Sequence, residues 1–324
     1  MIGSNLVKAL LSKGYRVSVV DNLWRGKKEY LMDGRGAALI DMENDFHEVD
    51  LTINGAADRL FDNVDYVFHL ADVVAGVDYV FNHEGSVFRR NLLINSNVIA
   101  TARKQPLKGF IYVGTACSFP AEKQFGVDAP ALREQDQYPA SPESAYGWSK
   151  LMGEYEALLM EQETGVPVSV LSLHNVYGTP CDFGERAQVI PALARKAAMY
   201  PKESFVVWGN GEQGRAFVHI DDVVEALILT MDKGLGKGVV QIGPDACTSI
   251  REIAQMLVRI SNKEIEIQYD TSKPVGDSGR CADFSKAKRL LGWQPRVGLS
   301  SGLSQVFHWV KKEIESGLSV FPED

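Results

Sequence analysis

The sequence is poor in cysteine. It holds only four in 324 residues, and none of them forms a C-x-x-C pair or shows a metal-ligand spacing. This scarcity argues against a disulfide scaffold, and we expect reduced thiols in a cytoplasmic protein. The six histidines also lack metal spacing, so no metal site is expected. The four cysteines are Cys117, Cys181, Cys247 and Cys281.

The chain also lacks an excess of positive charge and a long apolar run. Lysine and arginine total 34 against 42 aspartates and glutamates, a net charge of −8, so a general nucleic-acid binder is not expected. No apolar run reaches the ~18 residues of a membrane span, and we expect neither a membrane anchor nor a secretory signal. The hydrophobic share of 45% and the charged share of 23% are typical of a folded protein.

The first half of the chain alternates short apolar runs with longer helical stretches. After a helix that opens the chain, strands are expected at 16–21, 64–70, 109–113 and 167–171, and further helices near 86–104 and 145–164. Strands rich in β-branched residues with helices between them indicate a parallel sheet covered on both faces. The expected fold class is therefore α/β, with a doubly wound parallel sheet.

The pattern changes after about residue 176. Loops rich in glycine and proline interrupt shorter elements, and two helices are expected near 249–260 and 300–315. We therefore expect a cofactor-binding domain over 1–175 and a smaller α/β substrate domain over 176–324, with the segment near 216–242 returning to the first domain. Ligands of open α/β sheets bind at the carboxyl ends of the strands.

A glycine and an acid near the start fit a dinucleotide-binding unit. Gly3 precedes the first helix, where glycine lets backbone amides approach a pyrophosphate at the positive helix end. Asp21 ends the next strand, where an acid binds the adenine ribose hydroxyls, and Arg25 follows it. The alternative for Asp21 is a solvated loop acid. This interpretation predicts NAD and a Rossmann-type sheet, and we expect its first strand and remaining glycines upstream of the given start.

The sequence Tyr146-Gly147-Trp148-Ser149-Lys150 is a Y-x-x-x-K motif. On a helix, residues four positions apart share one face. An ammonium beside a phenol favours the phenolate, so we expect Lys150 to lower the pKa of Tyr146 from about 10 towards neutrality. Such a tyrosine can take a proton from a sugar hydroxyl while hydride leaves the same carbon. The alternative is a surface pair without chemistry.

Small polar side chains follow the strand at 109–113. Thr115 and Cys117 are expected to face the cleft, where Thr115 can bind a substrate hydroxyl and the Cys117 thiol, with an ordinary pKa of about 8.5, can exchange protons. Cys117 is equally well interpreted as a small buried hydrophobe. Arg215 and Arg280 each lie beside a flexible loop and suit a diphosphate, with a solvated salt bridge as the alternative for either one.

Taken together, these residues resemble the extended short-chain dehydrogenase/reductase family of NAD-dependent nucleotide-sugar epimerases and dehydratases. The likeness runs in order over nearly the whole chain. Its matching segments are Ile2-Gly3-Ser4, Asp21-Asn22-Leu23, His69-Leu70-Ala71, 91–97, 146–150, Asn175-Val176-Tyr177-Gly178, 211–215 and Leu291-Gly292-Trp293. The resemblance implies tightly held NAD and a homodimer paired through the helices at 86–104 and 145–164.

The resemblance also implies roles for individual residues. The implied catalytic residues are Tyr146, Lys150, Cys117 and Thr115. The implied NAD contacts are Gly3, Asp21, Asn22, Arg25, Asp50, Leu70, Ala71, Tyr146 and Lys150. The implied substrate contacts are Gly76, Thr115, Cys117, Asn175, Glu185, Arg186, Lys196, Gln213, Arg215 and Arg280.

The segment from Thr115 to Pro120 most resembles the family's 3,5-epimerases of GDP-hexoses, which implies that Cys117 moves a proton. Those enzymes have a lysine where Arg186 stands here, and arginine can bind but not release a proton. The resemblance implies an NAD-dependent epimerase that acts through a transient 4-keto sugar on GDP-mannose or a related GDP-hexose. A UDP- or GDP-sugar 4-epimerase or 4-ketoreductase and a non-catalytic nucleotide-sugar-binding protein remain alternatives.

Overall fold

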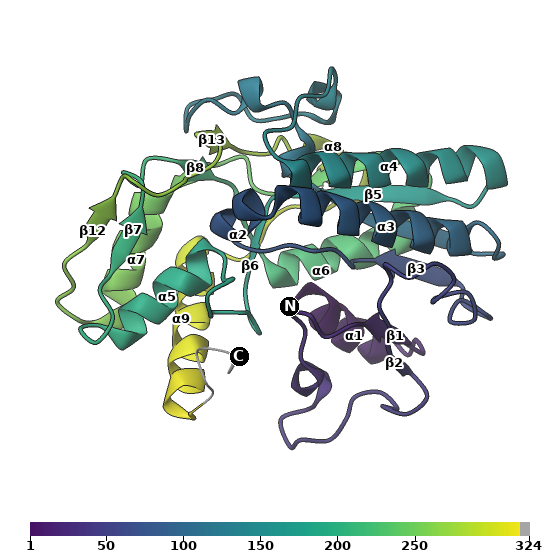
Figure 1. Cartoon of the computed structure of the whole chain (residues 1–324), viewed down its shortest axis with the longest axis horizontal. Helices are drawn as coiled ribbons and strands as arrows, with labels where there is room; N and C mark the ends of the chain where they lie inside the picture. The colour runs from purple at the N-terminus through teal and green to yellow at the C-terminus, as the bar shows by residue number, and fades with distance from the viewer. Residues whose placement is uncertain (318–324) are drawn as a thin grey trace.

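A computed structural model describes residues 1–317 of the chain. Its main sheet has four parallel strands in the order β10-β5-β4-β3 (Figure 1). Their bounds are Tyr66–His69 for β3, Gly109–Thr115 for β4, Val168–Leu173 for β5 and Gly238–Ile242 for β10. The expected parallel α/β fold is confirmed. No helix within residues 1–317 has the length and hydropathy needed to cross a bilayer.

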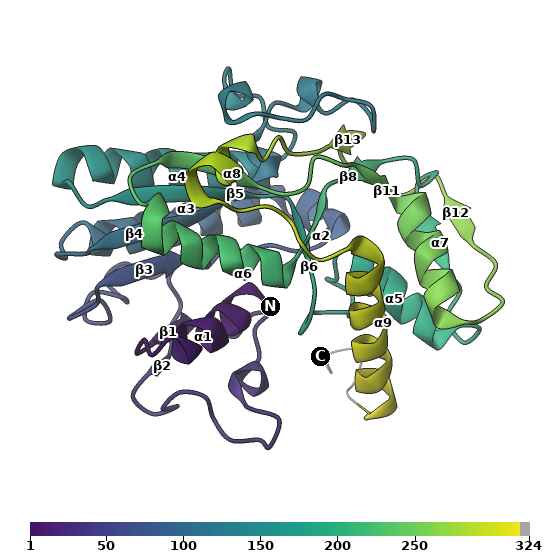
Figure 2. The ribbon, with the colours of Figure 1, turned by 180° about the vertical axis from the view of Figure 1, so that it is seen from behind.

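The side chains of β4 alternate between two cores. Phe110 and Tyr112 pack with α3 and α4 on one face of the sheet, and Ile111 and Val113 pack with α1 and α6 on the other. Figure 1 shows α3 and α4 on the near face, and Figure 2 shows α6 and α8 from behind. The bounds are Ile2–Ser12 for α1, Glu84–Ala102 for α3, Ala145–Thr164 for α4, Ile220–Leu229 for α6 and Ser285–Leu291 for α8.

The sheet is interrupted beside β3. Strands β1 (Val19–Asp21) and β2 (Phe46–Glu48) form a separate parallel pair. No strand within residues 1–317 fills the space between β1 and β3, because β1 pairs only with β2 and β3 only with β4. Residues of β1 and β3 line one large cavity.

The C-terminal part has its own core, in which α5, α7 and α9 pack with buried residues such as Phe205 and Val207. Small sheets join its segments: β12 pairs with β7, β6 pairs with β9, and β8 lies between β11 and β13. The helices span Val77–Asn82 for α2, Val189–Met199 for α5, Ile250–Ser261 for α7 and Leu299–Glu315 for α9. The strands span Asn175–Tyr177 for β6, Val206–Trp208 for β7, Gly214–Arg215 for β8, Phe217–His219 for β9, Thr248–Ser249 for β11, Gln268–Asp270 for β12 and Gly279–Arg280 for β13.

Local sequence signals set the ends of α4. At its start the Ser144 hydroxyl accepts a hydrogen bond from the Gly147 N–H at 3.2 Å, and at its end Gly165 takes a φ of 75° that favours glycine. A Cβ on Gly147 would collide with the Cys117 carbonyl. Glycine at this position therefore lets the start of α4 lie directly against the end of β4.

Two of the four cysteines form a disulfide. Cys247 and Cys281 are bonded, with 5.4 Å between their Cα atoms and 34 residues between them in sequence. The expectation of four reduced thiols is wrong for this pair. The two cysteines flank β11 and β13, which both pair with β8, and their sequence spacing gives no sign of that pairing.

Removing this disulfide is expected to lower the free energy of unfolding by about 2–4 kcal/mol, because the bond closes a long loop in the unfolded chain. Urea unfolding of the oxidised protein should be compared with that of the Cys247→Ser/Cys281→Ser double variant. The wild type in reductant serves as the control and should match the double variant. An unfolding midpoint that does not move on reduction would contradict the prediction.

Candidate active site

A cavity of about 1280 Å³ lies at the carboxyl ends of the main strands and extends between β1 and β3. Its size exceeds the roughly 300–1,000 Å³ of a site for one small molecule, in part because it includes the gap between β1 and β3. The predicted cofactor residues that line it are Gly3, Asp21, Asn22, Arg25, Leu70, Ala71 and Tyr146. The predicted substrate residues that line it are Gly76, Thr115, Cys117, Asn175, Glu185, Lys196, Gln213, Arg215 and Arg280.

Three predicted residues do not line the cavity. Lys150 lies behind Tyr146 and is only 1% exposed. Asp50 accepts hydrogen bonds from the backbone and hydroxyl of Thr52, which lower the pKa of its carboxyl. The Arg186 guanidinium lies over the rings of Trp24 and Tyr79, at 5.0 and 5.6 Å from their centroids. The predicted contacts of Lys150 and Asp50 with NAD, and of Arg186 with the substrate, stay predictions.

Tyr146 and Lys150 lie on one face of α4, as predicted. Both approach the same carboxylate oxygen: the Tyr146 hydroxyl donates a hydrogen bond to Asp72 Oδ2 at 3.2 Å, and Lys150 Nζ lies 3.3 Å from that oxygen. Lys150 Nζ also lies 4.6 Å from the centroid of the Tyr112 ring. The three polar groups thus form one buried cluster.

The predicted direction of the Tyr146 pKa is wrong for the cofactor-free chain. Burial raises the pKa of Tyr146 well above its usual value, and the negative charge of Asp72 raises it further. The prediction did not include Asp72, which lies against the Lys150 ammonium and offsets its charge. Tyr146 is therefore a neutral phenol here.

Thr115 and Cys117 end β4 next to α4. The Thr115 hydroxyl accepts a hydrogen bond from the Cys117 backbone N–H at 3.2 Å, which fixes the turn that presents Cys117 to the cavity. Cys117 is a free thiol and is partly exposed. This position agrees better with the interpretation of Cys117 as a thiol that faces the cleft than with its interpretation as a small buried hydrophobe.

Two buried arginines lie in the same cavity. Arg280 donates hydrogen bonds to Gln124 Oε1 at 3.0 Å and to Asp277 Oδ2 at 3.1 Å. Burial opposes its charge, but Cys117 and Asp277 raise the pKa of Arg280. Burial and the neighbouring Arg280 lower the pKa of Arg215 to about 10. Within the described part of the chain, Arg280 Nε is buried without a hydrogen-bond partner, so an anion at this place would satisfy it and reduce the repulsion between the two guanidinium groups.

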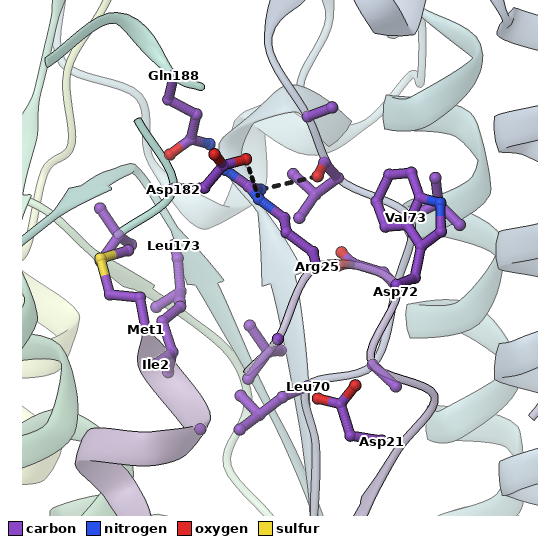
Figure 3. A pocket seen from close by; sticks show the side chains of 18 of the residues that line it. Met1, Ile2, Asp21, Arg25, Leu70, Asp72, Val73, Leu173, Asp182 and Gln188 are labelled. Atoms are coloured by element: carbon purple, nitrogen blue, oxygen red, sulfur yellow. Dashed lines mark hydrogen bonds and ion pairs between the residues drawn. The ribbon is translucent and has the colours of Figure 1, made fainter. Parts of the chain in front are cut away.

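The loop after β6 contacts the loop after β1 across the cavity. Arg25 Nε lies 3.3 Å from Asp182 Oδ2, and Arg25 Nη1 donates a hydrogen bond to the Val74 carbonyl at 2.8 Å (Figure 3). The Gly76 N–H donates to the Arg186 carbonyl, and a Cβ on Gly76 would lie 2.8 Å from the Ala187 carbonyl oxygen. These contacts hold the loop near residue 186 against the start of α2.

The residues around β1 fit a dinucleotide cofactor. Asp21 stands at the carboxyl end of β1, and its Oδ1 accepts the Leu23 N–H at 2.7 Å. A Cβ on Gly26 would lie 2.9 Å from Asp21 Oδ2, so glycine at this position leaves space beside the carboxylate. Residues of the first turn of α1 line the same cavity, and a helix N-terminus favours an anion.

Sequence reasoning missed three polar residues of the site. Asp72 directly follows the matched segment at 69–71, at the carboxyl end of a strand, and that position was a signal for it. Gln124 and Asp277 both accept hydrogen bonds from Arg280. Asp277 lies only three residues before Arg280, so its closeness in sequence was a signal for it, whereas Gln124 comes from a loop distant in sequence and carries no such signal. Among residues 1–317 no cluster of His, Cys, Asp and Glu is arranged to hold a metal ion.

Known proteins share this sequence pattern. Residues 1–243 match the model of the NAD dependent epimerase/dehydratase family. A GDP-mannose 3,5-epimerase from Arabidopsis thaliana is 31% identical over 314 residues, which cover 97% of this chain and 80% of the relative.

Solved structures share the fold. A UDP-glucose 4-epimerase from Thermotoga maritima, crystallised with UDP-glucose, superposes with a TM-score of 0.86 at 29% identity, covering 97% of this chain and 96% of its own. A UDP-glucuronic acid 4-epimerase from Bacillus cereus, in complex with UDP-glucuronic acid and NAD, has a TM-score of 0.77 at 25% identity and covers 96% of each chain. These relatives differ in the nucleotide sugar that each carries.

Proposed function

The chain belongs to the NAD dependent epimerase/dehydratase family, and from this premise we propose that it epimerises a nucleotide sugar through a transient 4-keto intermediate. The proposed substrate is GDP-mannose or a related GDP-hexose. The observation that carries the proposal is the position of Tyr146 and Cys117 in one cavity beside the buried Arg215 and Arg280. The name of the Arabidopsis relative supports the choice of sugar nucleotide.

The proposed chemistry divides proton transfers between two residues. NAD bound beside Asp21 and the first turn of α1 would supply the hydride acceptor and donor for C4 of the sugar. Once ionised, Tyr146 removes the C4 hydroxyl proton, with Lys150 on the same face of α4 and Thr115 positioned to bind a sugar hydroxyl. The C4 ketone acidifies the neighbouring C–H bonds, so that Cys117 can remove or return a proton at C5 or C3. Arg186 can bind substrate there but cannot serve as the acid.

We assign the remaining residues by their place in the cavity. Arg215, Arg280 and Asn175 bind the diphosphate. The sugar or phosphates lie near Gly76, Glu185, Arg186, Lys196 and Gln213. The cofactor contacts are Gly3, Asp21, Asn22, Arg25, Asp50, Leu70, Ala71, Tyr146 and Lys150. In this division residues 1–175 bind NAD and residues 176–324 bind the substrate, while β10 returns to pair with β5.

We further propose a homodimer that pairs through α3 and α4 in the cytoplasm. Large hydrophobic side chains on these two helices are exposed to solvent in the single chain, and pairing would bury them. They are Leu93, Trp148, Met152 and Tyr155. Light scattering tests the dimer, and cell fractionation tests the location.

Solvent deuterium tests the reaction. The protein, loaded with NAD, is incubated with GDP-mannose in deuterated water, and the sugar is then analysed by NMR. Deuterium at C3 or C5 is the expected result, because Cys117 would exchange its proton with solvent between removal and return. A purified protein that leaves both positions unlabelled with GDP-mannose and other GDP-hexoses would contradict the proposal.

The same experiment separates the alternatives. Inversion at C4 without deuterium at carbon would identify a 4-epimerase, the activity named for the Thermotoga relative. Net reduction of a supplied 4-keto sugar would identify a ketoreductase. A protein that binds nucleotide sugar but changes none of these positions, and shows no NADH absorbance, would be a binding protein.

A further inference from the structure

Asp72 occupies the point where Tyr146 and Lys150 meet. It lies in the loop between β3 and α2, and its side chain is 11% exposed. A single oxygen, Oδ2, lies 3.2 Å from the Tyr146 hydroxyl oxygen and 3.3 Å from Lys150 Nζ. Figure 3 shows Asp72 among the residues that line the cavity. The carboxylate is thus shared between the phenol and the ammonium.

Side chains of α3 bind the Val73 backbone on one side of Asp72 and the His69 side chain on the other. Asn91 accepts a hydrogen bond from the Val73 N–H at 2.6 Å, and it also donates to the Val73 carbonyl at 3.3 Å. On the other side, Asn95 Oδ1 lies 2.9 Å from His69 Nε2. Asn91 and Asn95 also donate to Ser149 of α4. The position of Asp72 relative to α4 is therefore fixed by buried hydrogen bonds and is not that of a free loop.

The charge balance of this cluster depends on Asp72. The groups that act on the Tyr146 hydroxyl are Asp72 from the loop after β3, Cys117 from the turn after β4 and Tyr112 from β4, and Lys150 of the same helix pairs with Asp72. A second carboxyl near Lys150 is Glu154 of α4, but burial raises its pKa to about 7, and Asp72 is the carboxylate that bonds both Tyr146 and Lys150. His69 adds no charge, because burial and the nearby Lys150 lower its pKa to about 3.

We propose that Asp72 is a positioning residue for Tyr146, which keeps the Tyr146 hydroxyl protonated and oriented in the cofactor-free chain by accepting its hydrogen bond and offsetting the charge of Lys150. This assignment rests on the proposed function of Tyr146 as the group that moves the sugar hydroxyl proton. Burial, followed by Asp72, raises the pKa of Tyr146, in agreement with this role. Lys150 alone would instead favour the phenolate.

Tyrosine ionisation measures the role of Asp72 without any substrate. The chain contains 11 tyrosines, so the signal of Tyr146 has to be isolated. Each protein is titrated by ultraviolet absorbance with and without the additional substitution Tyr146→Phe, and the difference between the two curves is the ionisation of Tyr146. In Asp72→Asn the phenol keeps a neighbour of the same shape but loses the negative charge. We expect Tyr146 to ionise at a pH lower by about one unit or more.

Two further variants make the measurement decisive. Asp72→Ser also removes the charge, and it replaces Asp72→Asn should the latter not fold. Asp128→Asn changes the net charge equally in an exposed loop outside the cavity, and its Tyr146 signal should coincide with that of the wild type. The proposal is overturned if neither neutral variant ionises Tyr146 at a lower pH than the wild type does.

Enzyme kinetics give a second, separate readout. The acidic limb of the kcat profile should move to lower pH in Asp72→Asn, whereas a merely structural role would lower kcat at every pH. If no sugar nucleotide is turned over by the wild type, the proposed function fails but the titration still decides the role of Asp72. If turnover is found and neither the titration nor the profile moves, Asp72 has no such role.

Discussion

Replacing Tyr146 with phenylalanine is expected to lower kcat by about a thousandfold, because the substitution removes only the hydroxyl that moves the proton. General acid–base groups of this kind contribute typically about 10²–10⁴-fold. The ring itself is partly buried against the core under α3 and α4 and would stay in place, so substrate affinity should change much less than kcat. Steady-state rates with the nucleotide sugar and titration of NAD binding measure the two effects separately.

The control for this variant is Tyr138→Phe. Tyr138 is 55% exposed, has no part in the cavity and loses the same oxygen atom, so its kcat should stay near that of the wild type. A Tyr146→Phe enzyme that keeps a third or more of its kcat would refute the role of Tyr146 as the base.

Replacing Cys117 with serine is expected to reduce the rate of deuterium incorporation at C3 and C5 by about a hundredfold or more. A serine hydroxyl has the same shape but holds its proton far more tightly than a thiol, so it cannot exchange a proton with carbon at neutral pH. Oxidation at C4 does not need Cys117, and a transient NADH absorbance should persist. The pattern of lost exchange with retained oxidation is specific to a 3,5-epimerase.

Cys181→Ser is the matched control for Cys117. Burial raises the pKa of the Cys181 thiol to about 12, so this thiol is inert and its replacement should leave the exchange rate unchanged. If Cys117→Ser instead keeps full turnover, Cys117 only packs or donates a hydrogen bond, and a 4-epimerase becomes the better assignment.

The sequence predicted best those features that depend on local pattern. β4 and β5 are continuous buried runs, and α4 begins at a serine cap and ends at a glycine, so their positions could be inferred from residue types alone. The face shared by Tyr146 and Lys150 follows from helical spacing in the same way. The helices α5, α6 and α8, which are shorter than α3 and α4, were not expected.

Features that depend on contacts between distant segments could not be predicted. The direction of the Tyr146 pKa depends on Asp72, which reaches α4 from a different strand. The Cys247–Cys281 bond depends on the pairing of β11 and β13 with β8. In both cases the prediction considered only neighbours in the sequence, and a residue that tertiary packing brings close makes that prediction wrong.

The break between β1 and β3 has a consequence for local opening. β3 is hydrogen-bonded to β4 on one side only, and β1 to β2 only, so each strand leaves a row of amides and carbonyls outside any ladder. β4 and β5 are bonded on both sides. Amide protons of β4 and β5 should therefore exchange with deuterated solvent most slowly, and those of β1 and β3 earlier, so that fluctuations of the sheet begin at the wall of the cavity.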